Sequence, residues 1–323
     1  MKKQLLIAAV AATMGTAAMA DVSITGDAKF EYFNTETSTV STNKTNTEVN
    51  LGIKGKNGDT TVVANLEFNT HDAASNMDIE DLYMTTKIGD VTVKGGNYAT
   101  GTSAILGEIE NGGRASNKVT ISGSTGGVSW YAGNSAAAGE GSTQLNGNMF
   151  VGGSMDVAGW KVQAKHNSAT VDSFGISGEV SGVGIRLEQK NDTAANGDTT
   201  FGNVTYSTNG IDLAYAWLDS DKANQIDEDD SAIFAVENGI VTATTDTGNA
   251  QITAKTSVAG NTVTVKSGSV ENGIATGTDL DYTQIAVSRP LASGATFAAT
   301  YTDKDDSATT DTQILELDLS VKF

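Results

Sequence analysis

Cysteine is absent from the 323-residue chain, and proline occurs once. The lack of cysteine excludes a disulfide framework and a thiolate metal site. Basic residues are scarce, because 20 Lys and Arg stand against 39 Asp and Glu, and the formal charge of −19 argues against a nucleic-acid partner. No run of about 18 apolar residues follows residue 20, which excludes a membrane-spanning helix there. Glycine, at 36 residues, and the abundant Thr, Ser, Asn and Val indicate strands and tight turns.

The first twenty residues have the pattern of a secretory signal peptide. Lys2 and Lys3 form a basic head, Leu5 to Ala12 form an apolar middle, and Ala18-Met19-Ala20 is a small-residue cleavage site. We therefore predict that residues 1–20 are removed during export and that the mature chain begins at Asp21.

Alternating apolar and polar residues dominate the mature chain, most clearly at its end. Every second residue from Leu315 to Phe323 is apolar, and polar residues stand between them, which predicts a strand with one apolar and one polar face. Similar segments recur along the chain, separated by pairs such as Asn57-Gly58 and Asn209-Gly210 that favour tight hairpin turns. Counting these segments predicts sixteen strands.

The connections between the expected strands alternate in length. Short glycine turns follow the even strands and longer or polar connections follow the odd strands, as in an up-and-down membrane barrel. An even strand number also lets the last strand close against the first without a free edge. The expected fold is therefore all-β, a 16-stranded antiparallel transmembrane β-barrel over residues 21–323. Residues 219–278, an acidic run followed by segments too short to span, are interpreted as one long extracellular loop.

Several features together resemble a general diffusion porin of the Gram-negative outer membrane. They are the Ala-x-Ala cleavage site, the opening strand DVSITGDAKFEYF, the alternation of connections, a long third loop and the terminal Phe323. The resemblance implies a water-filled channel in the cell outer membrane, through which small hydrophilic solutes and ions diffuse passively. The chain departs from this family in its long 219–278 loop and in lacking a Pro-Glu-Phe-Gly sequence in the third loop.

The same resemblance implies partners and an inward-folded third loop. Members of the family are usually homotrimers surrounded by lipid and lipopolysaccharide, and the third loop narrows the pore. Phe323 would act as the assembly signal that the barrel-assembly machinery recognises. The outward apolar faces would serve lipid and a partner subunit alike.

Side-chain alternation along each strand predicts which residues face the lumen. The pore-lining residues expected from this parity include Lys54, Glu67, Arg186, Glu188, Glu316 and Asp318, and the lysines Lys118, Lys165 and Lys190 share it. Cations and anions of this wall nearly cancel. Because the acidic excess falls largely in the outer loops, we expect a weak preference for cations.

The third loop, residues 98–117, is expected to form the constriction with the early strands. The residues expected there are Glu108, Glu110 and Arg114 of the loop and Lys29, Lys94, Asp81 and Lys87 of the wall. Carboxylates opposite lysines would produce a transverse field that orients polar solutes. Alternatively, the three charged loop residues pair with one another.

Enzymatic chemistry has little support in the sequence. The only histidines, His71 and His166, fall in a predicted loop and near the end of a strand, so a nucleophilic triad would have to use one of them. Neither a cofactor nor a metal is expected. An acidic group in residues 219–230 could gather calcium, but it lacks the glycine and spacing of an EF-hand loop, and the alternative is a solvated acidic loop. Its members are Asp219, Asp221, Asp227, Glu228, Asp229 and Asp230. The functional alternative to a channel is a barrel-anchored surface or adhesion protein that displays residues 219–278.

Overall fold

The computed structural model describes residues 21–70, 76–98, 115–134, 149–168, 171–192, 197–221, 233–234, 247–271, 279–306 and 311–323. Several predictions fall outside these ranges: the signal peptide, His71, Glu108, Glu110, Arg114 and the acidic run 227–230. The first strand begins at Asp21, the residue after the predicted cleavage site. Among the described residues, no helix is long and apolar enough to cross a membrane.

The described residues form eighteen strands. Their bounds are β1 (Asp21–Thr37), β2 (Ser41–Asn57), β3 (Thr60–Asn69), β4 (Asn76–Ile88), β5 (Val91–Tyr98), β6 (Ala115–Thr125), β7 (Val128–Asn134), β8 (Met149–Val157), β9 (Trp160–Asn167), β10 (Val171–Val180), β11 (Val183–Asp192), β12 (Gly197–Thr208), β13 (Ile211–Ser220), β14 (Gly248–Val258), β15 (Asn261–Glu271), β16 (Leu280–Pro290), β17 (Ala295–Asp306) and β18 (Thr312–Lys322).

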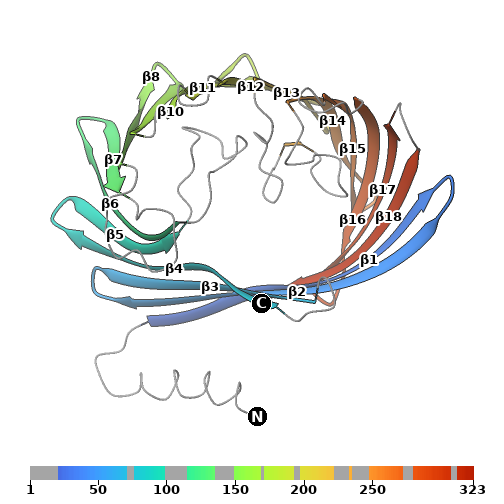
Figure 1. Ribbon diagram of the computed structural model, residues 1–323, viewed down its shortest axis with the longest axis horizontal. Coiled ribbons are helices and arrows are strands. Elements are labelled where there is room, and N and C mark those ends of the chain that lie inside the picture. The colour runs from blue at the N-terminus through green and yellow to red at the C-terminus, as the bar shows by residue number, and fades with distance from the viewer. Residues whose placement is uncertain are drawn as a thin grey trace, which may run out of the picture.

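The sheet closes into a barrel because each strand pairs antiparallel with the next and β18 pairs with β1 (Figure 1). The closing ladder begins with the pair Asp27 and Lys322. Next to it, Phe323 and Gly26 exchange two backbone hydrogen bonds of 2.9 Å. Every strand therefore has a partner on both sides, and the barrel exposes no edge of unpaired backbone groups.

The predicted all-β barrel is confirmed, but the predicted number of sixteen strands is wrong, because the described residues form eighteen. The two missed strands, β14 and β15, lie inside residues 219–278, which were expected to form one extracellular loop. Alternation is weak in both strands, because Ala, Thr and Ser share the outer face with residues such as Ile252 and Val265. Pairing with β13 and β16, rather than apolar contrast, holds these strands in the wall.

Tight turns follow all eight even-numbered strands that precede another strand, and each has two to four residues. In Asn209-Gly210 both residues have positive φ, 50° and 77°, as in a two-residue type I′ hairpin turn. Ala259-Gly260, which joins β14 to β15, has almost the same angles, 52° and 80°. The expected glycine turns are therefore confirmed, and one more lies in the segment that sequence analysis assigned to a loop.

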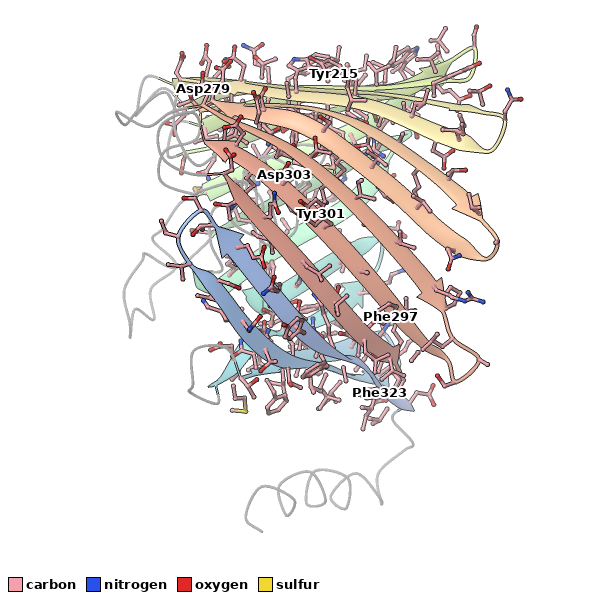
Figure 2. The ribbon with its side chains drawn as sticks, turned by 90° about the vertical axis from the view of Figure 1, so that its right-hand side faces the viewer. Tyr215, Asp279, Phe297, Tyr301, Asp303 and Phe323 are labelled. Atoms are coloured by element: carbon pink, nitrogen blue, oxygen red, sulfur yellow. The ribbon has the colours of Figure 1, made fainter. Side chains whose placement is uncertain are left out.

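The two faces of the barrel wall differ in chemistry. Large apolar side chains point outward and are exposed, such as Ile252 at 60% and Phe297 at 42%. Along β17, Figure 2 shows Phe297 near the rim with the tight turns and Asp303 toward the rim with the longer connections. Inward-facing side chains are polar and often buried, as with Thr302 at 0% and Glu188 at 2%. An apolar exterior and a polar interior are typical of a membrane barrel.

The closing contact predicts a specific assembly defect. Deleting Phe323, or the substitution Phe323→Ser, is expected to lower the amount of folded barrel in the outer membrane several-fold. Deletion removes both hydrogen bonds to Gly26, and either change removes the ring that packs over this glycine, where an added Cβ would lie 2.8 Å from the ring. The heat-dependent shift in electrophoretic mobility of outer-membrane fractions measures the folded barrel.

Phe297→Ser is the matched control for this experiment. Phe297 also exposes an aromatic ring on the outer face, but it lies within β17 rather than at the closing seam. Equal amounts of folded barrel from the wild type and both Phe323 variants would contradict the prediction.

Candidate functional site

The inner face of the barrel wall is the candidate site. Directly paired residues of neighbouring antiparallel strands share one face, so each ladder extends the assignment from one strand to the next. Glu31 pairs with Asp318 on β18 and with Asn46 on β2, and Glu188 pairs with Phe201. Glu31 and Glu188 are 6% and 2% exposed, and buried charges of this kind require polar partners. The inner wall is therefore polar and closely packed.

The residues predicted to line the pore all lie on this inner face. The ladders place Lys54 opposite Ser23, Glu67 opposite Asn50, Arg186 opposite Asn203 and Glu188 opposite Gly175, and they place Glu316 and Asp318 opposite Phe33 and Glu31. Asn69 Nδ2 donates a 2.6 Å hydrogen bond to the Glu67 carboxylate. The position of each side chain follows from the parity of its strand.

The wall residues predicted for the constriction also face inward, and two of them, Asp81 and Lys94, interact electrostatically. Lys29 on β1 forms an ion pair with Glu31. Asp81 on β4 accepts a 2.9 Å hydrogen bond from Asn65 Nδ2. Lys87 pairs with Thr92 beside the turn that joins β4 to β5. Their predicted partners Glu108, Glu110 and Arg114 lie outside the described residues.

Lys94, the fourth wall residue of that prediction, lies between two tyrosine rings. Its Nζ is 3.7 Å from the centre of the Tyr83 ring on β4 and 3.9 Å from the centre of the Tyr98 ring on β5. The two rings meet edge to face, with their centroids 5.8 Å apart. A cation over an aromatic face gains roughly 0.5 to 2 kcal/mol. The rings therefore hold this ammonium group at the wall.

Three further lysines continue from Lys94 along the inner wall, and we call the four the lysine row. Lys118 on β6 donates a 2.6 Å hydrogen bond from Nζ to the carbonyl oxygen of Tyr98. Lys165 on β9 and Lys190 on β11 follow. Lys118 interacts electrostatically with Lys94 and Asp81, and Lys165 with Lys118, Lys190 and Glu188. The parity of each strand predicts that these lysines face the lumen. It does not predict their grouping, because they come together only through the pairing of several strands.

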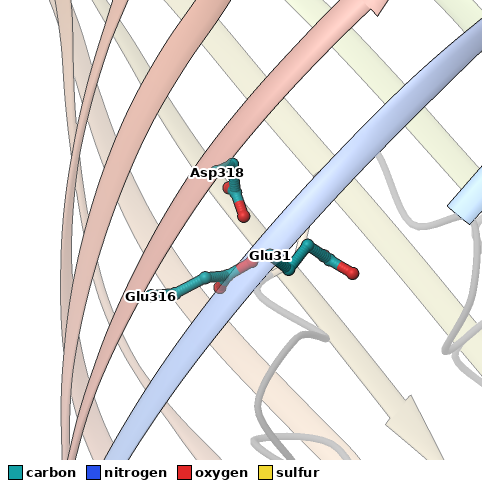
Figure 3. Close-up of side chains that lie close together, drawn as sticks. All are labelled: Glu31, Glu316 and Asp318. Atoms are coloured by element: carbon teal, nitrogen blue, oxygen red, sulfur yellow. The ribbon is translucent and has the colours of Figure 1, made fainter. Parts of the chain in front are cut away.

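Carboxylates gather at the closing seam, across the lumen from the start of the lysine row. Glu31, Glu316 and Asp318, which we call the seam cluster, belong to β1 and β18 (Figure 3). Figure 1 shows these two strands on one side of the ring and β5 and β6 on the other. Opposite charges on opposite walls produce a transverse field in a narrow lumen. The field that the sequence predicts between the third loop and the wall lysines stays a prediction, because Glu108, Glu110 and Arg114 lie outside the described residues.

A short segment between β13 and β14 packs against the inner wall. The Phe234 side chain is 1% exposed and lies edge to face on Phe201, with ring centroids 6.0 Å apart. Leu218, Val270 and Tyr282 complete the apolar cluster around it. A buried phenylalanine of this kind stabilises its contact by roughly 3 to 5 kcal/mol relative to alanine.

Hydrogen bonds fix the backbone of this segment as well. Gln251 Nε2 donates to the carbonyl oxygen of Ile233 at 2.7 Å, and Lys266 Nζ donates to that of Phe234 at 3.3 Å. We call Ile233 and Phe234 the loop anchor. The loop anchor was not predicted from the sequence, because residues 219–278 were interpreted as one extracellular loop. The available signal was Phe234 itself, an aromatic residue next to an acidic run.

His166 lies on the outer wall rather than in the lumen. Its Nδ1 is 2.6 Å from Asp172 Oδ1, and both side chains are more than half exposed. This pair is therefore separate from the inner-face groups described above.

The loop anchor leads to a testable expectation. The substitution Phe234→Asp is expected to release this segment from the wall, because it replaces a buried ring by a charged group inside an apolar cluster. In planar lipid bilayers the single-channel conductance should rise. The matched variant is Phe201→Leu, which alters the same apolar cluster without adding a charge. Phe30→Asp is not a suitable control, because Phe30 is exposed on the outer face. Unchanged conductance for Phe234→Asp would contradict the role of the anchor.

Comparison with known proteins identifies the fold but no close relative. No protein-family model matches the chain, and a search of curated proteins finds no similar sequence. Among solved structures, Pseudomonas aeruginosa OccK11 (OpdR) matches with 13% identity and a TM-score of 0.66 over 94% of this chain and 96% of that chain. P. aeruginosa OpdK, solved with vanillate, matches with 12% identity and a TM-score of 0.68 over 94% and 98%.

A third solved structure is P. aeruginosa OccK2 (OpdF) in complex with glucuronate, with 11% identity, a TM-score of 0.66 and coverage of 94% of this chain and 98% of that chain. These neighbours are outer-membrane porins of the Occ type. They lend no support to the general diffusion subtype suggested by the sequence, which stays a prediction. At such low identities the likeness defines the architecture. The chain has the closed all-β barrel fold of the Occ channels.

Proposed function

We propose that the chain is an outer-membrane porin through which small hydrophilic solutes diffuse passively. The observation that carries this proposal is the closed barrel with an apolar outer face and a charged, polar inner face. Such a wall shields water and polar solutes from lipid. The fold shared with the Occ porins supports the same conclusion.

We further propose that the favoured solutes are small molecules with a carboxylate group. The lysine row places four ammonium groups on adjoining parts of the wall, with Glu188 beside Lys165. Ammonium groups donate charge-assisted hydrogen bonds to carboxylates. Two structural neighbours were solved with vanillate and with glucuronate, which are both carboxylates. The weak cation preference expected for simple ions stays a prediction, because it depends on Glu108 and Glu110 and on the outer loops.

The alternative is a surface or adhesion protein that displays residues 219–278. The structure of this segment supports it less than the sequence did. Two wall strands occupy 248–271, and the loop anchor lies against the inner wall. Less of this segment is therefore left for display than the sequence suggested.

Planar lipid bilayers test the channel directly. Purified mature protein is expected to produce stepwise increases in conductance that grow with salt concentration. Steps in groups of three would support the predicted homotrimer, and single steps would argue for independent channels. A folded barrel that inserts but stays electrically silent would overturn the proposed function.

The lysine row predicts a change in solute preference. The double substitution Lys165→Gln and Lys190→Gln is expected to slow glucuronate entry into proteoliposomes several-fold and to leave glucose entry unchanged, because only glucuronate carries a charge for the row to attract. Liposome swelling measures both rates. Lys54→Gln is the matched control, since Lys54 also faces the lumen but lies on β2, away from the row. Equal slowing of both sugars would show a general effect on the pore and contradict the proposed preference.

A further inference from the structure

Three polar side chains lie together on the outer wall, where β9 ends and β10 begins. His166 of β9 lies directly opposite Asp172 of β10, and its Nδ1 is 2.6 Å from Asp172 Oδ1. Ser168 follows two residues after His166, just past the end of β9. Residues two apart on a strand share one face, and all three side chains are exposed. The group therefore lies at the rim with the longer connections, on the outside of the barrel.

The contact with Asp172 determines which imidazole nitrogen of His166 is available. An ionised carboxylate only accepts hydrogen bonds, so Nδ1 carries the proton that it donates to Asp172 and Nε2 is left as an acceptor. An imidazole in this state is a general base, and the carboxylate keeps it in one orientation.

Ser168 is placed to act as the nucleophile for this base. Its Oγ accepts a 2.9 Å hydrogen bond from the backbone N–H of Met149 on β8, and among the described residues it donates none. Two residues of a strand span about 6.6 Å, a distance that an imidazole ring and a hydroxyl group together reduce to hydrogen-bond reach. Catalytic hydrogen bonds of this kind often tighten only when the substrate is bound.

An apolar hollow in the outer wall adjoins these groups. It has a volume of about 590 Å³, within the range of small-molecule sites. Ser168 and His166 line it together with side chains of β6, β7 and β8, among them Val119, Ile121, Ala132, Met149 and Val151. The hollow opens on the apolar face of the barrel, so the molecule that fills it would come from the lipid. An acyl chain in the hollow would bring its ester group to the polar end, beside Ser168.

We propose that Ser168, His166 and Asp172 form an esterase site on the outer wall, which cleaves acyl esters of membrane glycerophospholipids. Ser168 and His166 are the catalytic residues, and Asp172 is a positioning residue that holds the imidazole. This activity goes beyond the passage of solutes through the lumen and does not depend on it.

The reaction needs only the lipid and water. Ser168 Oγ bonds to the ester carbonyl carbon while its proton passes to His166 Nε2. The bond from that carbon to the glycerol oxygen then breaks, and this oxygen takes the proton, which leaves the acyl group on Ser168. Water attacks the acyl carbon and gives a proton to His166, which returns it to Ser168 Oγ as the fatty acid leaves.

Two measurements on the mature wild-type protein test the site. In detergent micelles that contain dioleoylphosphatidylethanolamine, the protein is expected to release oleate, which mass spectrometry detects. Diisopropyl fluorophosphate is expected to add one phosphoryl group per chain at Ser168 with loss of fluoride. A folded protein that releases no oleate and takes up no label would overturn the proposal, and its conductance in planar bilayers would still test the channel separately.

Serine variants assign the activity to this group. Ser168→Ala is expected to lower oleate release by roughly a hundredfold or more and to abolish labelling, since loss of the nucleophile costs at least that much in known triads. Ser267→Ala is the matched control, because Ser267 is also exposed on the outer wall but meets Thr283 at 3.5 Å rather than a histidine. The folded electrophoretic mobility shows that each variant forms the barrel. Oleate release that persists in folded Ser168→Ala would contradict the assignment.

The positioning role of Asp172 has its own test. Asp172→Ala is expected to lower oleate release roughly tenfold or more, and Asp172→Glu, which keeps a carboxylate for the imidazole, is expected to restore part of it. Equal rates in Asp172→Ala and the wild type would contradict this role.

Filling the hollow separates a lipid site from a merely reactive serine. Ala132→Trp is expected to lower oleate release several-fold and to leave labelling by the small fluorophosphate unchanged, because the new ring occupies the space of the acyl chain. Ala299→Trp, on the outer face of β17 between Val287 and Leu317, is the matched control. Unchanged oleate release in folded Ala132→Trp would contradict the assignment of the hollow.

Discussion

The structure depends on the closure of its sheet. A strand at an open edge exposes backbone N–H and C=O groups, and in a membrane no water is present to satisfy them. Here β1 pairs with β2 on one side and with β18 on the other, and the ladder continues through the last residue by the two hydrogen bonds between Phe323 and Gly26. The seam cluster lies on the inner face of this same junction. The first and last strands therefore meet at a junction that contains both backbone hydrogen bonds and buried carboxylates.

Closure of the sheet also gives the two faces of each strand different surroundings. In an open sheet both faces meet the same solvent, but a closed wall separates an exterior from a lumen. Apolar residues such as Phe297 are then exposed on the exterior, while Glu188 and Lys118 face inward. Because the interior is narrow, charges from strands that are distant in the sequence act on one another. The lysine row and the seam cluster are consequences of this geometry, because each joins residues of strands that are distant in the sequence.

The loop anchor shows how a connection becomes part of the wall. Phe234 occupies an apolar cluster made by inward-facing residues of β12, β13, β15 and β16, and hydrogen bonds from Gln251 and Lys266 hold its backbone segment. Apolar residues on an otherwise polar inner face would be costly if they met water, so the anchor and the cluster protect each other. The same part of the chain supplies β14 and β15, which makes residues 219–278 a structural segment of the barrel.

Local pattern determined much of this protein. The strict alternation from Leu315 to Phe323, and glycine pairs such as Asn209-Gly210, depend on neighbouring residues only, and they predict strands, turns and inward parity wherever the contrast is strong. The pattern failed in β14 and β15, where small and polar residues share the outer face and the strands gain their place from pairing with β13 and β16. Tertiary structure alone decided the strand number, the position of Phe234, the grouping of the lysine row and the meeting of Glu31 with Asp318. These features join residues that are far apart in the chain. Local periodicity does not predict them, because it carries no information on which strands become neighbours.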